Sequence, residues 1–384
     1  MRVTHVITRL IVGGAQENTV STVLGLLRRP GFEVDLVSGP SEGAEGSLEK
    51  LFTDSPNVLN LEPALIRAVR PWTDLQCYLR LVERFKQTRP EIVHTHSGKA
   101  GILGRLAAKR AGVPCIIHTI HGPSFGPFQG ALANAVFTNA ERIAGRVTTH
   151  FITVAEAMTR QYLAAGIGRP GQYARIFSGF NLQPFARAAN DPLLRARLGI
   201  KPEDFVVGKI ARLFELKGHD DLFVSAPELV ARIPNLKFLL VGDGPWRSRF
   251  EHMAQAMGLA QHFIFTGLVP PTEVCQYVGI MDALVHLSLR EGLPRALPQA
   301  MTAGKPVVAY ACDGAPEVCL DNETGYLIPP GDRKLLVQRL VQLAGSAALR
   351  HRLGETGRQL ALKQFSEEGM VEAIANLYRN LRPA

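Results

Sequence analysis

The chain has 384 residues, of which 46% are hydrophobic and 20% charged, and a formal net charge of +9. This length exceeds one hydrophobic core and suits two domains, while the lack of any apolar run of about 18 residues excludes a membrane-spanning helix. The positive charge indicates an anionic partner, but scattered basic residues and an aromatic content of 7% argue against a nucleic-acid-binding surface.

Cysteine usage and the first residues indicate the compartment. Five cysteines at irregular spacings, without a C-x-x-C pair, predict reduced thiols. The opening segment MRVTHVITRL is typical of a buried strand and lacks the apolar core of a signal peptide. We therefore expect a cytoplasmic protein.

Short apolar segments alternate with amphipathic ones through the first half of the chain. Strand-like segments rich in Val, Ile and Phe lie at residues 4–10, 32–39, 91–97, 114–122, 150–156 and 174–180. Residues 73–87 are a typical helical segment between them, with an apolar face made of Leu75, Tyr78, Leu79, Val82 and Phe85. Such alternation predicts a parallel sheet covered by helices on both faces.

The alternation of strand-like and helical segments stops at residues 181–204. These residues are polar, contain no strand and are predicted to connect two domains. A second series of strand-like segments follows at residues 205–213, 236–245, 263–269, 283–289, 306–311 and 324–330. We predict an α/β protein of two Rossmann-like, doubly wound domains, residues 1–185 and 186–365, that face a central cleft. The amphipathic residues 366–384 form a final helix that we expect to pack back on the first domain.

Ligands of open α/β sheets bind beyond the carboxyl ends of the strands, beside helix N-termini. Gly13 and Gly14 follow the first strand, where a glycine pair lets the backbone approach a phosphate or a sugar closely. A plain tight turn explains the pair equally well. The G-x-G-x-x-G pattern of dinucleotide-binding proteins is missing.

Two cations follow the first strand of the second series. Arg212 ends this strand, and Lys217 precedes Gly218 at the start of the next helix. Cations beside a helix N-terminus are suited to neutralise a diphosphate leaving group. A solvated strand end is the alternative, and the adjacent glycine favours the functional interpretation.

An acid stands at a comparable position later in the chain. Glu291 follows the strand-like segment ALVHLSL and precedes a helical stretch. It could cap that helix or face the cleft, and the neighbouring candidates favour the cleft. Gly242, in the run GDGP, could line a nucleotide or form only a sharp turn.

Histidines end two strands of the first series. His121 lies beside Gly122 and is predicted on a loop, whereas His94 and His96 end a neighbouring strand. Alternate histidines suggest metal ligands, but no acidic partners with suitable spacing accompany them. We therefore predict no metal site.

In this order and spacing, motifs along nearly the whole chain resemble the family-4 retaining glycosyltransferases of GT-B fold. The motifs are GGAQ, HTIHG, ARLFELKG, VGDGP, FTGLV, EGLPRALPQAMTAGKPVVA, DGAPEV and TGYLIPPGD. The resemblance implies an N-terminal domain that mainly binds the acceptor. It also implies a C-terminal domain that mainly binds a nucleotide-diphosphate sugar.

The resemblance assigns four catalytic residues. Arg212 and Lys217 match the pair that binds the diphosphate, in agreement with their charge. His121 matches the histidine that contacts the donor sugar near the reaction centre. Glu291 matches the first glutamate of the E-x7-E motif, which lies against the donor sugar.

Further matches concern donor binding. Gly13 and Gly14 match a mobile glycine loop near the phosphates and the acceptor. The segment that matches the base-contacting edge comprises Gly267, Leu268 and Val269. The backbone expected to approach the sugar or phosphate comprises Gly292, Leu293, Pro294 and Arg295.

One residue departs from the family pattern. Gln299 stands where the second glutamate commonly binds the ribose hydroxyls. An amide offers one acceptor oxygen where a carboxylate accepts from two hydroxyls, and neutral hydrogen bonds are weaker than charge-assisted ones. We expect ribose binding to persist but to be weaker.

The resemblance implies retention of anomeric configuration without a metal or other cofactor, and the sequence has no D-x-D pair. The predicted enzyme moves a hexosyl-type sugar from a nucleotide-diphosphate sugar, UDP-linked, to a saccharide, lipid-linked or small-molecule acceptor. Two alternatives are a GT-B-fold nucleotide-sugar epimerase or hydrolase, and a non-catalytic sugar-nucleotide-binding protein.

Six basic residues also lie at intervals within residues 61–90, namely Arg67, Arg70, Arg80, Arg84, Lys86 and Arg89. They could meet anionic lipid at the inner face of the membrane, beside a lipid-linked acceptor. A solvated helix face is the simpler interpretation and is favoured.

Overall fold

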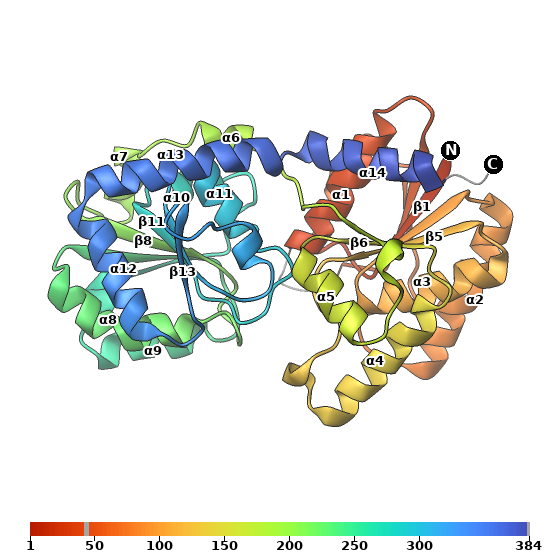
Figure 1. Ribbon diagram of the computed structural model, residues 1–384, viewed down its shortest axis with the longest axis horizontal. Coiled ribbons are helices and arrows are strands. Elements are labelled where there is room, and N and C mark those ends of the chain that lie inside the picture. The colour runs from red at the N-terminus through yellow and green to blue at the C-terminus, as the bar shows by residue number, and fades with distance from the viewer. Residues whose placement is uncertain (42–45, 382–384) are drawn as a thin grey trace. The chain divides into compact units, whose positions relative to one another are not determined.

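The computed structural model describes residues 1–41 and 46–381. The chain divides into two compact units, one of residues 1–180 with the residues from 367 onward, and one of residues 181–366. Each unit contains one parallel sheet flanked by helices (Figure 1), which confirms the predicted α/β class. Among the residues described, no helix combines the length and apolar character needed to cross a membrane.

The first unit is built on a seven-stranded sheet with the order β3-β2-β1-β4-β5-β6-β7. Its strands are β1 (Arg2–Ile7), β2 (Glu33–Ser38), β3 (Leu59–Leu61), β4 (Ile92–His96), β5 (Cys115–Ile120), β6 (His150–Thr153) and β7 (Tyr173–Arg175). Its helices are α1 (Gly14–Leu27), α2 (Pro71–Thr88), α3 (Gly98–Ala111), α4 (Ala131–Gly145), α5 (Glu156–Ala164) and α14 (Glu367–Leu381), with short 3-10 helices η1 (Glu49–Phe52), η2 (Pro127–Gln129) and η3 (Pro170–Gln172). Strands β4 and β5 are buried along their whole length, as expected for a parallel sheet covered on both faces.

Helix α2 corrects one expectation from the sequence. Phe85 is buried as predicted, but Leu75 and Leu79 are exposed, with exposed fractions of 47% and 55%. Cys77 and Leu81 lie in the core instead. Since residues four apart share a helix face, the row of residues 77, 81 and 85 is the one that α2 buries where it packs beside α3.

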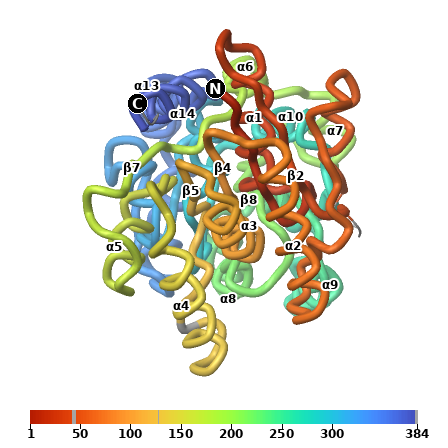
Figure 2. The backbone as a smooth tube through the Cα atoms, turned by 90° about the vertical axis from the view of Figure 1, so that its right-hand side faces the viewer, coloured from red at the N-terminus to blue at the C-terminus, as the bar shows by residue number. Residues whose placement is uncertain are grey.

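Helix α14 packs within the first unit although it lies at the other end of the sequence. It buries Met370, Ile374 and Tyr378 on one face and lies beside α1 (Figure 2). Gly25 of α1 permits the close approach, because a Cβ there would lie 2.6 Å from Cγ2 of Val371. The core of the first sheet therefore contains side chains from both ends of the chain.

The second unit is built on a six-stranded sheet with the order β10-β9-β8-β11-β12-β13. Its strands are β8 (Phe205–Ile210), β9 (Leu236–Val241), β10 (Phe263–Gly267), β11 (Ala283–His286), β12 (Val307–Tyr310) and β13 (Gly325–Ile328). Its helices are α6 (Gln183–Ala186), α7 (Pro192–Arg197), α8 (His219–Arg232), α9 (Arg247–Ala256), α10 (Val274–Gly279), α11 (Ala296–Thr302), α12 (Arg333–Gly345) and α13 (Ala347–Gln364), with short 3-10 helices η4 (Ala260–His262) and η5 (Ala315–Glu317).

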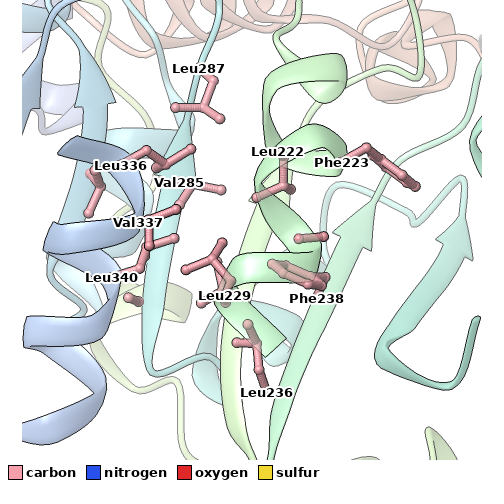
Figure 3. Packing of buried hydrophobic residues seen from close by; sticks show 14 of the residues in the cluster. Leu222, Phe223, Leu229, Leu236, Phe238, Val285, Leu287, Leu336, Val337 and Leu340 are labelled. Atoms are coloured by element: carbon pink, nitrogen blue, oxygen red, sulfur yellow. The ribbon is translucent and has the colours of Figure 1, made fainter. Parts of the chain in front are cut away.

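The core of the second unit fixes the ends of its central strands. Leu222 and Leu229 of α8 and Leu340 of α12 are fully buried against the sheet (Figure 3). Val285 of β11 and Phe238 of β9 meet them from the strands. Burial of each such side chain contributes about 1.5–3 kcal/mol, so the loops that leave β8 and β11 start from rigid positions.

The topology marks where ligands should bind. Strand order reverses between β1 and β4 in the first sheet and between β8 and β11 in the second. Ligands of open α/β sheets bind at the carboxyl ends of the strands beside such a reversal. Lys217 follows β8 and Glu291 follows β11, and Gly13 follows β1.

Three buried histidines occupy the centre of the first sheet. His5 on β1 and His94 and His96 on β4 are fully buried. Burial lowers the pKa of His5 to about 3 and the pKa values of His94 and His96 well below 6.5, with neighbouring histidines adding to the effect on the latter two. All three rings are therefore neutral in the folded protein near pH 7.

This burial predicts a loss of stability in mild acid. In the unfolded chain histidines titrate near pH 6.5, so below that pH the unfolded state binds more protons than the folded one. Stability is full above pH 6.5 and falls as the pH is lowered toward the folded pKa values, by a slope approaching about 1.4 kcal/mol per pH unit for each histidine.

Urea unfolding between pH 7.5 and 5, above the range in which most carboxylates titrate, measures this effect. A His351→Asn variant, which removes an exposed histidine, should show the same pH dependence as the parent. An unfolding free energy independent of pH in this range would contradict the burial of neutral histidines.

Candidate active site

The loop after β8 adopts a constrained backbone that carries Lys217 toward β11. Leu216 and Gly218 both have left-handed conformations, with φ of +63° and +65°. A Cβ at Gly218 would lie 1.9 Å from the carbonyl oxygen of Leu287, so only glycine permits this approach. The amide of Leu289 donates to the carbonyl of Leu216 at 2.9 Å and fastens the two loops together.

Lys217 and Glu291 form an ion pair across these loops. The Nζ atom of Lys217 donates to Oε1 of Glu291 at 2.6 Å. Burial opposes ionisation of Glu291, but the Lys217 ammonium outweighs it and the pKa of the carboxyl is lowered. The backbone amide of Glu291 donates to Oδ2 of Asp313 at 2.7 Å, which fixes the loop from its other side.

Two further titratable groups stand behind the pair. Lys209 on β8 is buried, and burial together with the repulsion of Lys217 lowers its pKa to about 7. His286 ends β11 with its Nε2 atom 3.6 Å from Oε1 of Glu291, and burial lowers its pKa to about 4. This density of perturbed groups at a strand edge is typical of a functional site.

Arg212 lies on the same loop as Lys217 and is exposed. Its guanidinium carbon lies 5.7 Å from the ring centre of Phe214, and its carbonyl is within 3.0 Å of Nε2 of His219 at the start of α8. The loop thus offers one half-buried cation and one exposed cation beside the N-terminus of α8. Such an arrangement can bind a diphosphate.

Glycines line the neighbouring strand ends. Gly242 follows β9 and Gly267 ends β10, and the amide of Gly242 donates to the carbonyl of Gly267 at 3.1 Å. A Cβ at Gly242 would lie 2.3 Å from the carbonyl of Ala211, next to Arg212. The side chain of Leu268 is exposed and that of Val269 is buried.

The segment between Glu291 and α11 is the most buried part of the predicted site. Gly292, Leu293 and Pro294 are buried, whereas Arg295 and Gln299 are half-buried. Arg295 is the N-cap residue of α11, and its carbonyl accepts from the amide of Gln299 at 3.2 Å.

The remaining predicted residues lie in the first unit. Gly13 is the N-cap residue of α1 with an extended backbone, and Gly14 is the first residue of the helix. His121 follows the last residue of β5, which agrees with its prediction as a loop residue. Its Nε2 atom lies 3.0 Å from Nδ1 of His96.

The structure thus unites Lys217 and Glu291 directly, with Arg212, Gly242 and the start of α11 on the same edge of the second sheet. Sequence reasoning missed three groups of this cluster: Lys209, His286 and Asp313. Lys209 carried a usable signal, because a lysine inside the apolar segment FVVGKIARL is costly to bury without a partner. Asp313 opens the motif DGAPEV, but the motif does not indicate its partner, since only the fold brings Asp313 to Glu291.

Comparison with known proteins identifies the family. Residues 190–360 match the family described as glycosyl transferases group 1, and residues 13–177 match the glycosyl transferase 4-like domain. The 2-deoxystreptamine N-acetyl-D-glucosaminyltransferase of Streptomyces fradiae is 30% identical over 341 residues, 84% of this chain and 75% of that protein. The chain belongs to the family-4, group 1 glycosyltransferases.

Other relatives and solved structures agree. An Escherichia coli UDP-Gal:alpha-D-GlcNAc-diphosphoundecaprenol alpha-1,3-galactosyltransferase is 27% identical over 98% of this glycosyltransferase and 96% of its own length. Anabaena HepE in complex with UDP-glucose has a TM-score of 0.80 at 21% identity, covering 99% and 100% of the two chains. Sucrose-phosphate synthase from Thermosynechococcus elongatus has a TM-score of 0.82 at 22% identity, covering 99% of each chain. The predicted GT-B fold is confirmed.

The packing of Gly218 predicts a local cost for any side chain there. Gly218→Ala adds a Cβ to a left-handed residue and into the Leu287 carbonyl. We expect the unfolding free energy to fall by roughly 2–4 kcal/mol and the Lys217–Glu291 pair to separate.

Gly258→Ala is the matched control, because Gly258 has a φ of +68° and no atom within 4 Å of a built Cβ. It should cost only the backbone strain of about 1–2 kcal/mol. Urea unfolding compares the two variants, and equal losses would show that the contact with Leu287 is unimportant.

Proposed function

We propose that this glycosyltransferase moves a hexosyl-type sugar, with retention of configuration, from a UDP-linked donor to a saccharide, lipid-linked or small-molecule acceptor. The observation that carries the proposal is the Lys217–Glu291 ion pair at the reversal point of the second sheet. The second unit is assigned mainly to the donor and the first unit mainly to the acceptor. No metal or other cofactor is required in this proposal.

The nucleotide assignment draws support from relatives. The Escherichia coli relative is named for UDP-Gal, and HepE was solved with UDP and with UDP-glucose. A Mycolicibacterium smegmatis relative, 29% identical over 74% of each chain, is instead a GDP-mannose-dependent mannosyltransferase. A thermal-shift panel of UDP-, GDP- and ADP-sugars tests the choice, because the donor that binds the folded protein raises its melting temperature.

The chemistry proposed is departure of a nucleoside diphosphate. The bond between the anomeric carbon and the phosphate oxygen breaks as an acceptor hydroxyl attacks from the same face, and the departing phosphate oxygen takes the hydroxyl proton. Arg212 and Lys217 stabilise the charge that develops on the phosphate. Lys217 has three N–H donors, so its bond to Glu291 leaves it able to bind phosphate.

Glu291 and His121 have different roles in this proposal. Glu291 holds the Lys217 ammonium in one orientation and lies against the donor sugar. His121 acts on the donor sugar near the reacting carbon. The donor-binding backbone comprises Gly13, Gly14, Gly242, Gly267, Leu268, Val269, Gly292, Leu293, Pro294 and Arg295.

A lipid surface is not needed to explain the basic residues of α2. Arg80 pairs with Glu62 at 3.0 Å and Arg84 with Asp35 at 2.8 Å. These partners within the unit support the solvated face over a lipid-binding one. Vesicle co-sedimentation tests this choice.

Removal of either proposed phosphate-binding cation should abolish most of the activity. We expect Arg212→Ala and Lys217→Ala each to slow release of nucleoside diphosphate by roughly 10²–10³-fold. Arg232→Ala, on the exposed last turn of α8, is the control and should retain full activity.

A coupled assay with the nucleotide sugar and an acceptor panel measures this release. Undiminished rates in both variants would show that the proposed diphosphate site is wrong. Rapid turnover of donor alone would instead favour an epimerase or hydrolase, and tight binding without turnover a non-catalytic protein.

The two positions of the glutamate motif should respond in opposite ways. Glu291→Gln removes the charge that orients Lys217, and we expect kcat to fall by roughly 10²-fold. Gln299→Glu adds a second acceptor oxygen for hydroxyls, and we expect an unchanged or lower KM for the donor. Steady-state kinetics separates these effects, and a reversed pattern would overturn the division of roles.

A further inference from the structure

A continuous row of buried polar groups leads to the half-buried His121. The hydroxyl of Thr119 on β5 lies 2.6 Å from Nε2 of His94, and Nδ1 of His94 contacts the hydroxyl of Tyr378 on α14. Tyr378 contacts Nε2 of His5 at 3.4 Å, the longest link. Nδ1 of His5 then lies 2.9 Å from Nε2 of His96.

The last link joins Nδ1 of His96 to Nε2 of His121 at 3.0 Å. The row therefore runs from Thr119 through His94, Tyr378, His5 and His96 to His121. Every interior member is fully buried, and each uses both of its hydrogen-bonding positions within the row. No charged side chain takes part in these links.

The interior members are uncharged. Burial lowers the pKa values of the three interior histidines and raises that of Tyr378 well above 10. A neutral imidazole has one N–H donor and one acceptor nitrogen. Each ring must therefore donate at one end and accept at the other, so that one ring's tautomer determines the next.

Thr119 decides between the two directions that the row allows. If the Thr119 hydroxyl donates to His94, every link of the row joins a proton to an acceptor, and the remaining proton lies on Nδ1 of His121, which is only half-buried. If the row runs the other way, the Thr119 hydroxyl proton has none among the contacts of the described residues, and a buried unsatisfied hydroxyl costs about 1–3 kcal/mol. The first direction is therefore favoured.

We propose that this row is a positioning device for His121, which fixes its tautomer. In the favoured direction His94, His5 and His96 each carry their proton on Nδ1 and pass a hydrogen bond toward His121. Nε2 of His121 then accepts, and its proton lies on Nδ1. Only the effect on catalysis rests on the proposed function, because the tautomer is a property of the first unit alone.

The same histidines raise the question of a metal. His5, His94 and His96 each offer a nitrogen, all within 4.8 Å of one another. All six ring nitrogens are already engaged in the links described above. A metal would have to displace several of these bonds, so the row explains the cluster more simply.

Nitrogen-15 NMR of histidine-labelled protein near pH 7 tests the assignment, since it distinguishes protonated from unprotonated ring nitrogens. We expect His5, His94, His96 and His121 all to carry the proton on Nδ1. A proton on Nε2 of His121, mixed tautomers in the parent protein, or stoichiometric zinc that binds these rings would overturn the proposal.

Variants remote from His121 sharpen the test. Tyr378→Phe removes the central hydroxyl and Thr119→Val the anchoring one, and each should give mixed tautomers at His121. Thr119→Ser retains the hydroxyl and should retain the single tautomer. His118→Gln is the matched control, because His118 is buried on β5 and contacts Thr95 outside the row. A fixed tautomer in both Tyr378→Phe and Thr119→Val would overturn the proposal.

Kinetics of the same variants connects the row to catalysis. Tyr378→Phe should lower kcat roughly five- to tenfold, the effect of one hydrogen bond, with little change in the KM for the donor. If the tautomers are ordered but the protein transfers no sugar, the positioning role of the row is supported and the proposed function is refuted. If the protein transfers sugar but the variants have unaltered tautomers, the proposed function is supported and the positioning role of the row is refuted.

Discussion

The ion pair between Lys217 and Glu291 joins the two loops on which the candidate site depends. Each loop leaves a central strand of the second sheet, and each is fixed from a second side, one by Gly218 against Leu287 and the other by Asp313. A half-buried charge pair of this kind contributes little net stability, because desolvation offsets much of the attraction. Its value lies in orientation, since the lysine is held in a single direction.

Constraints on the backbone explain why this pair can form. Leu216 adopts a left-handed conformation that costs a non-glycine residue about 1–2 kcal/mol. Strain of this type persists where surrounding structure overdetermines it, and it is concentrated at functional sites. Here the amide of Leu289 and the missing side chain of Gly218 provide that surrounding structure. The loop after β8 therefore holds Lys217 in a defined position at some cost in stability.

The sequence predicted the fold class and most of the strands because parallel strands are continuous apolar runs, but it missed the short edge strand β3. It predicted the buried face of α2 less well. On α2 the pair Leu75 and Leu79 and the pair Cys77 and Leu81 are both apolar enough to be buried. Only packing beside α3 selects the second pair. Local periodicity cannot distinguish two adjacent stripes when both contain leucine.

The candidate site could also be predicted only in part from local sequence. Arg212, Lys217 and Glu291 were predicted because strand ends and glycines mark them locally. Asp313 and the partners of His121 were not, because each contact joins segments that are distant in sequence, and Tyr378 comes from the last helix.

The candidate site and the histidine row differ in how they handle charge. In the second unit, Lys217 keeps Glu291 ionised despite burial, so the site retains charge. In the first, His5, His94 and His96 are buried without a carboxylate among their links and are neutral. A neutral row carries no net charge, but its hydrogen bonds all point the same way, because the donor of each link determines the acceptor of the next. That property is suited to setting the orientation of a proton on His121 without placing a cation in the first sheet.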